Sequence, residues 1–159
     1  MRKIDFTIDF SNVGTEAAKL VECALLDADP ELPLPDVAPE SGGEEEMESL
    51  VEEGAMRLCC RLVGRVDSWL RRGSGLEMRF SLSSTVPTGV DPVLTGSFRS
   101  WCAYYAAAAW LKRFSGEQRA LDSAAVLESA AGELASAVDS ILYSRRDAPG
   151  AVRLRLSPF

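Results

Sequence analysis

This 159-residue chain contains no histidine. Its main candidates for chemistry are therefore sought among thiols, carboxylates and guanidinium groups. Without histidine, Ser-His-Asp and Cys-His catalysis are excluded, and so are histidine-ligated zinc or iron and the usual general base at neutral pH. The Gly-Ser-Gly sequence at 73–75 lacks the Lys-Ser/Thr of a phosphate-binding loop. We therefore expect no catalytic residue, no cofactor and no metal, and a protein that is not an enzyme.

The adjacent thiols of Cys59 and Cys60 could form a redox pair. However, neighbouring residues on a helix point about 100° apart, so a bond between them would break the helix. The four cysteines, at positions 23, 59, 60 and 102, also lack the Cys-x-x-Cys spacing. We expect reduced thiols that pack as small hydrophobic groups in the core or at its boundary.

The glutamates between positions 44 and 53 are the other chemical candidates, because Mg²⁺ accepts oxygen ligands and needs no histidine. Glutamates crowded at a helix start diverge around the helix, whereas a metal site needs carboxylates that converge. Their position suits the helix macrodipole instead. We favour capping and solvation, and keep a Mg²⁺-dependent enzyme as an alternative.

Guanidinium groups are the candidates for a protein interface. Three arginines recur every four residues and two more end the last predicted helix, where positive charge complements the helix dipole; they are Arg57, Arg61, Arg65, Arg145 and Arg146. The first three could grip phosphate or a partner's carboxylates. Glu53, four residues before Arg57, favours an ion-paired, solvated helix face instead.

Alternation of apolar and polar residues predicts three strands, at 2–10, 76–83 and 151–157, which could form one small sheet. Helical periodicity predicts four helices. The first covers 15–28, and the second covers 44–72 with Val66 and Trp69 on its inner face. The third begins with Asp91 as N-cap and Pro92 at the first helical position. The fourth follows a capping box at 115–118 and continues past Ile141.

These elements predict an α+β fold that is mainly α. The third and fourth helices form an antiparallel hairpin within a four-helix bundle, because both carry many alanines and the fourth has apolar spacings of three and four. The length is that of a single domain, 1–159, interrupted by a loop rich in Pro and Gly at 30–43.

Aromatic residues concentrate in the third predicted helix, within 97–114. Four of them could either fill the core or line a pocket for an apolar ligand: Phe98, Trp101, Tyr105 and Trp110. A helix that is apolar on all sides is normally buried, and a ligand pocket needs convergent polar groups. We favour core packing and keep the pocket as the alternative.

The net charge of −7 argues against binding to nucleic acid or anionic membranes. The longest apolar run, 101–111, is too short to span a bilayer. The N-terminal ten residues alternate apolar and charged residues and carry no signal-peptide core. We therefore expect synthesis in the cytoplasm and no membrane partner.

The order of these sequences along the chain resembles a group of small proteins from tailed phages and prophages of gut Bacteroidetes. The resemblance rests on an opening strand that ends in DFSNV, a strand with the sequence LEMRFSLSS, WLKRF at 110–114 and ILYSRR at 141–146. It implies a virion structural or assembly protein, similar to helical head-to-tail connector subunits that form a ring beneath the portal.

The resemblance leads us to expect a non-catalytic protein that self-associates as a homo-oligomer and contacts portal or tail proteins, and that is located in the virion. A ring subunit needs exposed strand edges and a rigid bundle, and the predicted strands and helices provide both. The alternative is a small cytoplasmic binding or regulatory protein whose bundle holds an apolar ligand or a partner helix.

Overall fold

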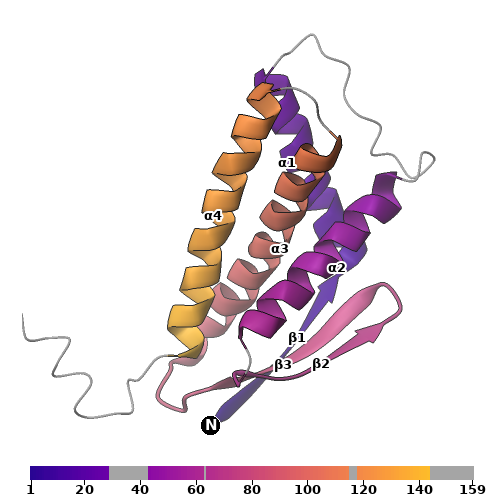
Figure 1. Ribbon diagram of the computed structural model, residues 1–159. Helices are drawn as coiled ribbons and strands as arrows, with labels where there is room; N and C mark the ends of the chain where they lie inside the picture. The colour runs from indigo at the N-terminus through magenta and orange to yellow at the C-terminus, as the bar shows by residue number, and fades with distance from the viewer. Residues whose placement is uncertain (29–42, 63, 115–117, 144–159) are drawn as a thin grey trace, which may run out of the picture.

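A computed structural model describes residues 1–28, 43–62, 64–114 and 118–143 of the chain (Figure 1). The predicted strand at 151–157, the arginines Arg145 and Arg146, most of the capping box and all but the last residue of the loop at 30–43 lie outside the described residues. The described elements are β1 (Arg2–Asp9), α1 (Phe10–Ala28), α2 (Gly43–Arg61), β2 (Val66–Arg72), β3 (Gly75–Leu82), the 3-10 turn η2 (Thr88–Val90), α3 (Asp91–Phe114) and α4 (Gln118–Leu142). This arrangement confirms the predicted mainly helical α+β fold.

The sheet is antiparallel and has the order β1-β3-β2, so β3 is the central strand. β1 pairs with β3 without interruption, from Arg2 opposite Leu82 to Asp9 opposite Gly75. β2 and β3 form a hairpin through residues 73 and 74, and Gly73 has φ 56°, a value that favours glycine.

The four helices gather on one side of the sheet (Figure 1). α3 and α4 lie side by side as the predicted antiparallel hairpin, with Ala106, Ala107 and Ala108 of α3 and Ala124 and Ala131 of α4 buried. Small side chains at these positions let the two helix axes approach closely.

An aromatic cluster joins the sheet to the helices. The ring of Phe80 from β3 lies 5.6 Å from that of Phe98 on α3, and the ring of Phe6 from β1 lies 6.0 Å from Phe98 in an edge-to-face arrangement. Phe80 and Phe98 are fully buried, whereas Phe6 is only partly buried. The inner face of the sheet is therefore held against α3 by packed rings.

The prediction of one long helix over 44–72 is wrong in its second part. α2 ends at Arg61, and the chain turns through Gly64 at φ 94° into β2. Val66 and Trp69 therefore lie on the inner face of a strand, paired with Phe80 and Met78. Gly64 was a signal for this turn, because a helix interior disfavours glycine.

The starts of two helices also differ from the prediction. α1 begins at Phe10, because the Asp9 carboxylate accepts hydrogen bonds from the backbone N–H groups of Ser11 and Asn12 and so caps this end. Asp91 is not an N-cap, because its φ of −55° and ψ of −47° are helical. Its carboxylate instead forms an ion pair with Arg2, which ties β1 to α3.

In the part of the chain that the structure describes, no helix combines the length and the apolar character that crossing a bilayer would require.

Candidate functional site

The outer edge of β1 is a strand edge that pairs with no other described strand. β1 contacts only one other strand of the described sheet, β3, and its far side faces no described strand. Its inner-face residues Ile4 and Phe6 are only partly buried, although Ile8 is fully buried. We call this backbone edge, together with the half-buried side chains of Ile4 and Phe6, the β1 edge.

The direction of the backbone groups along the β1 edge follows from the register. The N–H of Phe10 donates to the carbonyl oxygen of Ser74 at 2.9 Å, which continues the β1–β3 ladder by one residue. Hydrogen bonding alternates along an antiparallel strand, so the even-numbered residues of β1 point their backbone groups toward β3. The N–H and C=O groups of Lys3, Asp5, Thr7 and Asp9 therefore point outward.

The opposite edge of the sheet, on β2, is less suited to pairing. The register of β2 against β3 shifts between Val66 and Ser68, which is a β-bulge. A bulge bends and twists its strand, and it is a common way to block an edge. β2 also ends in Arg71 and Arg72, which form exposed ion pairs with Glu52 and Glu77. β1, in contrast, has neither a bulge nor a proline.

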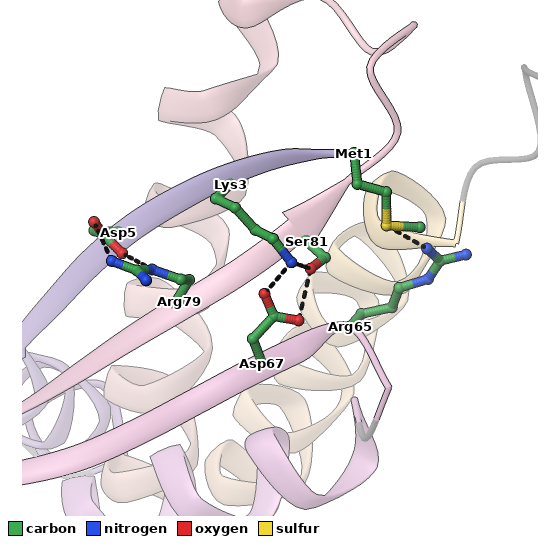
Figure 2. Close-up of polar contacts among 7 residues, drawn as sticks. All are labelled: Met1, Lys3, Asp5, Arg65, Asp67, Arg79 and Ser81. Atoms are coloured by element: carbon green, nitrogen blue, oxygen red, sulfur yellow. Dashed lines mark hydrogen bonds and ion pairs between the residues drawn. The ribbon is translucent and has the colours of Figure 1, made fainter.

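The bulge places Asp67 where it can reach across the outer face of the sheet (Figure 2). The Ser81 hydroxyl donates to Asp67 Oδ1 at 2.6 Å, and Lys3 Nζ donates to the Ser81 hydroxyl at 2.6 Å and also to Asp67 Oδ2. The hydrogen bonds from Lys3 and Ser81 hold the pKa of Asp67 below its usual range. One residue from each of the three strands therefore takes part in a single polar network.

This network contains a serine, a lysine and a carboxylate, so it could be mistaken for a nucleophilic site. Ser81 is only 2% exposed, and its hydroxyl both donates to Asp67 and accepts from Lys3. Lys3 Nζ donates both to the carboxylate of Asp67 and to the Ser81 hydroxyl, so its hydrogen bonds are directed within the network. The arrangement accounts for strand register rather than for bond cleavage.

A second ion pair crosses the outer face beside this network. Arg79 Nε donates to Asp5 Oδ1 at 2.6 Å, and its Nη2 donates to Asp5 Oδ2 at 3.1 Å, a two-point geometry (Figure 2). The hydrogen bond from Arg79 lowers the pKa of Asp5. The side chains of Lys3 and Asp5 are thus held on the outer face of the sheet, and neither forms a hydrogen bond with the outward backbone groups of β1.

The four aromatic residues predicted as core or pocket lie at different depths. Phe98 and Trp110 are buried in the bundle, whereas Trp101 and Tyr105 are stacked on each other at 5.1 Å and only partly buried. Two surface cavities, of about 480 and 490 Å³, are lined by other residues. The structure thus brings Trp101 and Tyr105 together, and neither of these two cavities is lined by any of the four residues.

The stacked pair lies against α2 at Gly54. A Cβ atom at this glycine would lie 2.7 Å from Tyr105 Cδ1 and 3.2 Å from Trp101. The Tyr105 hydroxyl donates to Glu53 Oε1 at 2.9 Å. Burial alone would raise the pKa of Glu53, but this hydrogen bond and the charges of Arg113 and Arg57 outweigh it and lower the pKa.

The arginines predicted as a possible interface are largely occupied within the chain. Arg57 pairs with Glu53 at 3.2 Å, as the spacing predicts, and also lies over the ring of Tyr105. Arg61 pairs with Asp139 of α4 at 2.5 Å. Arg65 follows α2, and its guanidinium carbon lies 5.3 Å from the centre of the Tyr143 ring. Its Nη1 also lies 3.9 Å from the sulfur of Met1 (Figure 2).

The thiols of the described residues are free, and the described carboxylates form no metal-binding cluster. Cys59 and Cys102 are buried, Cys23 and Cys60 are exposed, and all four are free thiols. Burial raises the pKa of Cys59 to about 12, so this thiol is a poor nucleophile. Nowhere in the described ranges do three or more His, Cys, Asp or Glu side chains converge to hold a metal ion.

Sequence reasoning predicted β1 as a strand and expected exposed strand edges, but it did not identify which edge is exposed. Finding that edge requires the strand order, which depends on β2, a strand that was predicted as helix. A usable signal was present, because Gly-Ser-Gly at 73–75 separates two stretches with apolar residues and fits a hairpin turn.

Comparison of the chain with protein-family models, with curated proteins and with solved structures finds no match.

Proposed function

We propose that this protein is a non-catalytic structural or assembly protein of a tailed phage or prophage particle, as a head-to-tail connector subunit, and that it binds protein partners through the β1 edge. The observation that carries the binding role is the uninterrupted β1 strand with its outward N–H and C=O groups. An extended segment of a partner can add to such an edge and gains main-chain hydrogen bonds by doing so.

The described side chains support a binding role more than a chemical one. The serine, lysine and carboxylate groups on the outer face of the sheet are engaged with one another. The four helices form a rigid support behind the sheet, because Phe6, Phe80 and Phe98 fix the sheet to α3. The assignment to a phage particle rests on the resemblance of the sequence.

The experiment that tests this function is co-expression with the portal and tail proteins encoded in the same genome, followed by purification of the complex. Thr7→Pro is the decisive variant, because it removes an N–H that points outward and leaves the β1–β3 ladder intact. We expect the wild-type chain to co-purify with a portal or tail protein and Thr7→Pro to lose that partner.

A matched control is Arg71→Pro on the other edge of the sheet. Arg71 lies opposite Leu76 between two residues that pair with β3 through their backbone groups, so its own N–H also points away from the sheet. This variant should keep the partner. A wild-type chain that binds neither portal nor tail proteins, or a Thr7→Pro chain that binds them as well as wild type, would contradict the proposal.

A further inference from the structure

We propose that the β1 edge binds the β1 edge of a second copy of this chain, antiparallel and with the two-fold axis at Phe6. This inference rests on the proposed function, since it names a partner for the same site. The second copy and a portal or tail segment would occupy the β1 edge in turn, so the dimer is the form of the free protein. The two sheets would then join into one continuous sheet in the order β2-β3-β1-β1-β3-β2, with the helices of both copies on the same side.

The choice of Phe6 as the centre follows from side-chain charge. With the axis at Phe6, Lys3 of each copy lies opposite Asp9 of the other, and Asp5 lies opposite Thr7. An axis at Asp5 would place two Asp5 carboxylates opposite each other, and an axis at Thr7 would place Asp5 opposite Asp9. Like charges directly opposite on neighbouring strands are destabilising, so both of these registers are disfavoured.

The hydrogen-bonding parity of β1 agrees with this register. The outward backbone groups belong to Lys3, Asp5, Thr7 and Asp9, and the Phe6-centred register pairs these residues only with one another. An axis at Ile4 also avoids repulsion between like charges, but it shortens the pairing to Arg2 through Phe6 (β1 extends to Asp9). The Phe6 register uses most of the strand.

The polar groups at this edge have unused capacity for the new contacts. Lys3 has three N–H donors and uses two of them, one on Asp67 and one on Ser81, which leaves one for Asp9 of the second copy. Asp9 caps α1 with Oδ1, and its Oδ2 accepts no hydrogen bond from the described residues. Both partners of the proposed ion pair can therefore form it without giving up an existing contact.

The apolar side chains of β1 explain what a second copy would cover. Ile8 is fully buried, but Ile4 and Phe6 on the same face remain partly exposed. In the Phe6-centred register, Ile4 lies opposite Ile8 of the second copy, and the two Phe6 rings face each other at the axis. Burial of the remaining apolar surface of Ile4 and Phe6 would favour association.

The first test is molar mass by light scattering across a concentration series. We expect wild type to reach twice the chain mass of 17.2 kDa and Thr7→Pro to remain near the chain mass, with a dissociation constant raised about tenfold or more. Arg71→Pro should behave as wild type. A wild-type chain that stays monomeric, or a Thr7→Pro chain that dimerises as wild type does, would overturn the inference.

The register has its own test at Thr7, which lies opposite Asp5 of the second copy. Thr7→Lys should lower the dissociation constant and Thr7→Asp should raise it, each compared with wild type at the same salt concentration. Thr7 also lies opposite Glu77 within the chain, so thermal unfolding must show that both variants fold. Equal effects of the two substitutions, or the reverse order, would overturn this register.

A third arm separates this partner from the alternating segment at 151–157, which could also supply a strand. Leu154→Pro in the full chain should leave the dimer intact, and loss of the dimer would overturn the inference in favour of that segment.

Failure of the inference is distinct from failure of the proposed function. A monomer that still binds portal or tail proteins through Thr7 refutes only the former, and a dimer that binds neither refutes only the latter.

Discussion

Gly54 is the residue at which the packing of α2 against α3 leaves least room. A methyl group there would meet the Tyr105 ring at 2.7 Å, well inside contact distance. Gly54→Ala should therefore lower the free energy of unfolding by about 1–2 kcal/mol, because the cost of overpacking exceeds the gain in helix propensity. Urea denaturation monitored by circular dichroism measures this change.

Gly132 on α4 provides the matched control for Gly54. It is exposed, and nothing lies within 4 Å of the position that its Cβ would occupy. Gly132→Ala should therefore raise the free energy of unfolding by up to about 1 kcal/mol. Opposite signs for two Gly-to-Ala changes in helices would identify the Tyr105 contact as the cause, whereas equal signs would contradict it.

Glu53 connects the stability of the α2–α3 contact to pH. Its pKa is lowered in the folded chain from the ordinary value of 4.5. Its contribution to stability is therefore complete above the unfolded pKa and is lost as the pH falls through the folded pKa. Glu53→Gln should cost about 1 kcal/mol at pH 7 and should flatten the decline in stability below about pH 4.5.

Denaturant unfolding of wild type and Glu53→Gln between pH 3 and pH 7 checks this prediction. Asp5 and Asp67 also have lowered pKa values, so some decline should remain in the variant. Parallel curves for the two proteins over the whole range would show that Glu53 makes no pH-dependent contribution.

At the scale of elements, the contact between sheet and bundle depends on Phe98. This residue is 0% exposed and its ring packs against those of both Phe6 and Phe80, whereas Phe114 at the end of the same helix is 49% exposed. Phe98→Ala should lower the free energy of unfolding by about 3–5 kcal/mol. Phe114→Ala should cost less than about 1 kcal/mol, and comparable losses in the two variants would contradict this assignment.

Local patterns predicted the elements that have a single strong period. The alternation in β1 and β3 and the apolar stripes of α1, α3 and α4 were sufficient to place them, with errors of a few residues at the ends. β2 was missed because Val66 and Trp69 are three residues apart, which also fits a helix face. The bulge between Val66 and Ser68 removes the strict alternation that would have identified a strand.

The candidate site was less predictable than the fold, since it depends on strand order. The sequence of β1 does not indicate that the strand pairs with β3 on one side and with no described strand on the other. The interaction that places β3 in the centre is non-local, as the network of Lys3, Asp67 and Ser81 shows. Predicted site residues such as Arg61 proved to be engaged within the chain by partners that are distant in sequence.

At the scale of the whole molecule, the thiols report on the integrity of the fold. Cys59 and Cys102 are buried between helices and sheet, and burial raises the pKa of both. In the folded protein at pH 8, a thiol reagent should react rapidly with Cys23 and Cys60 only, and all four should react in denaturant. Rapid reaction of all four thiols in the native chain would contradict the described packing.

The bulge in β2 limits how large any assembly built through this sheet can become. Within the described sheet, β1 is the regular edge and the bulge makes the β2 edge irregular. A copy added at β1 would therefore present only irregular β2 edges to the next copy. This arrangement disfavours repeated strand addition through the described sheet, and so it opposes fibre growth by that route.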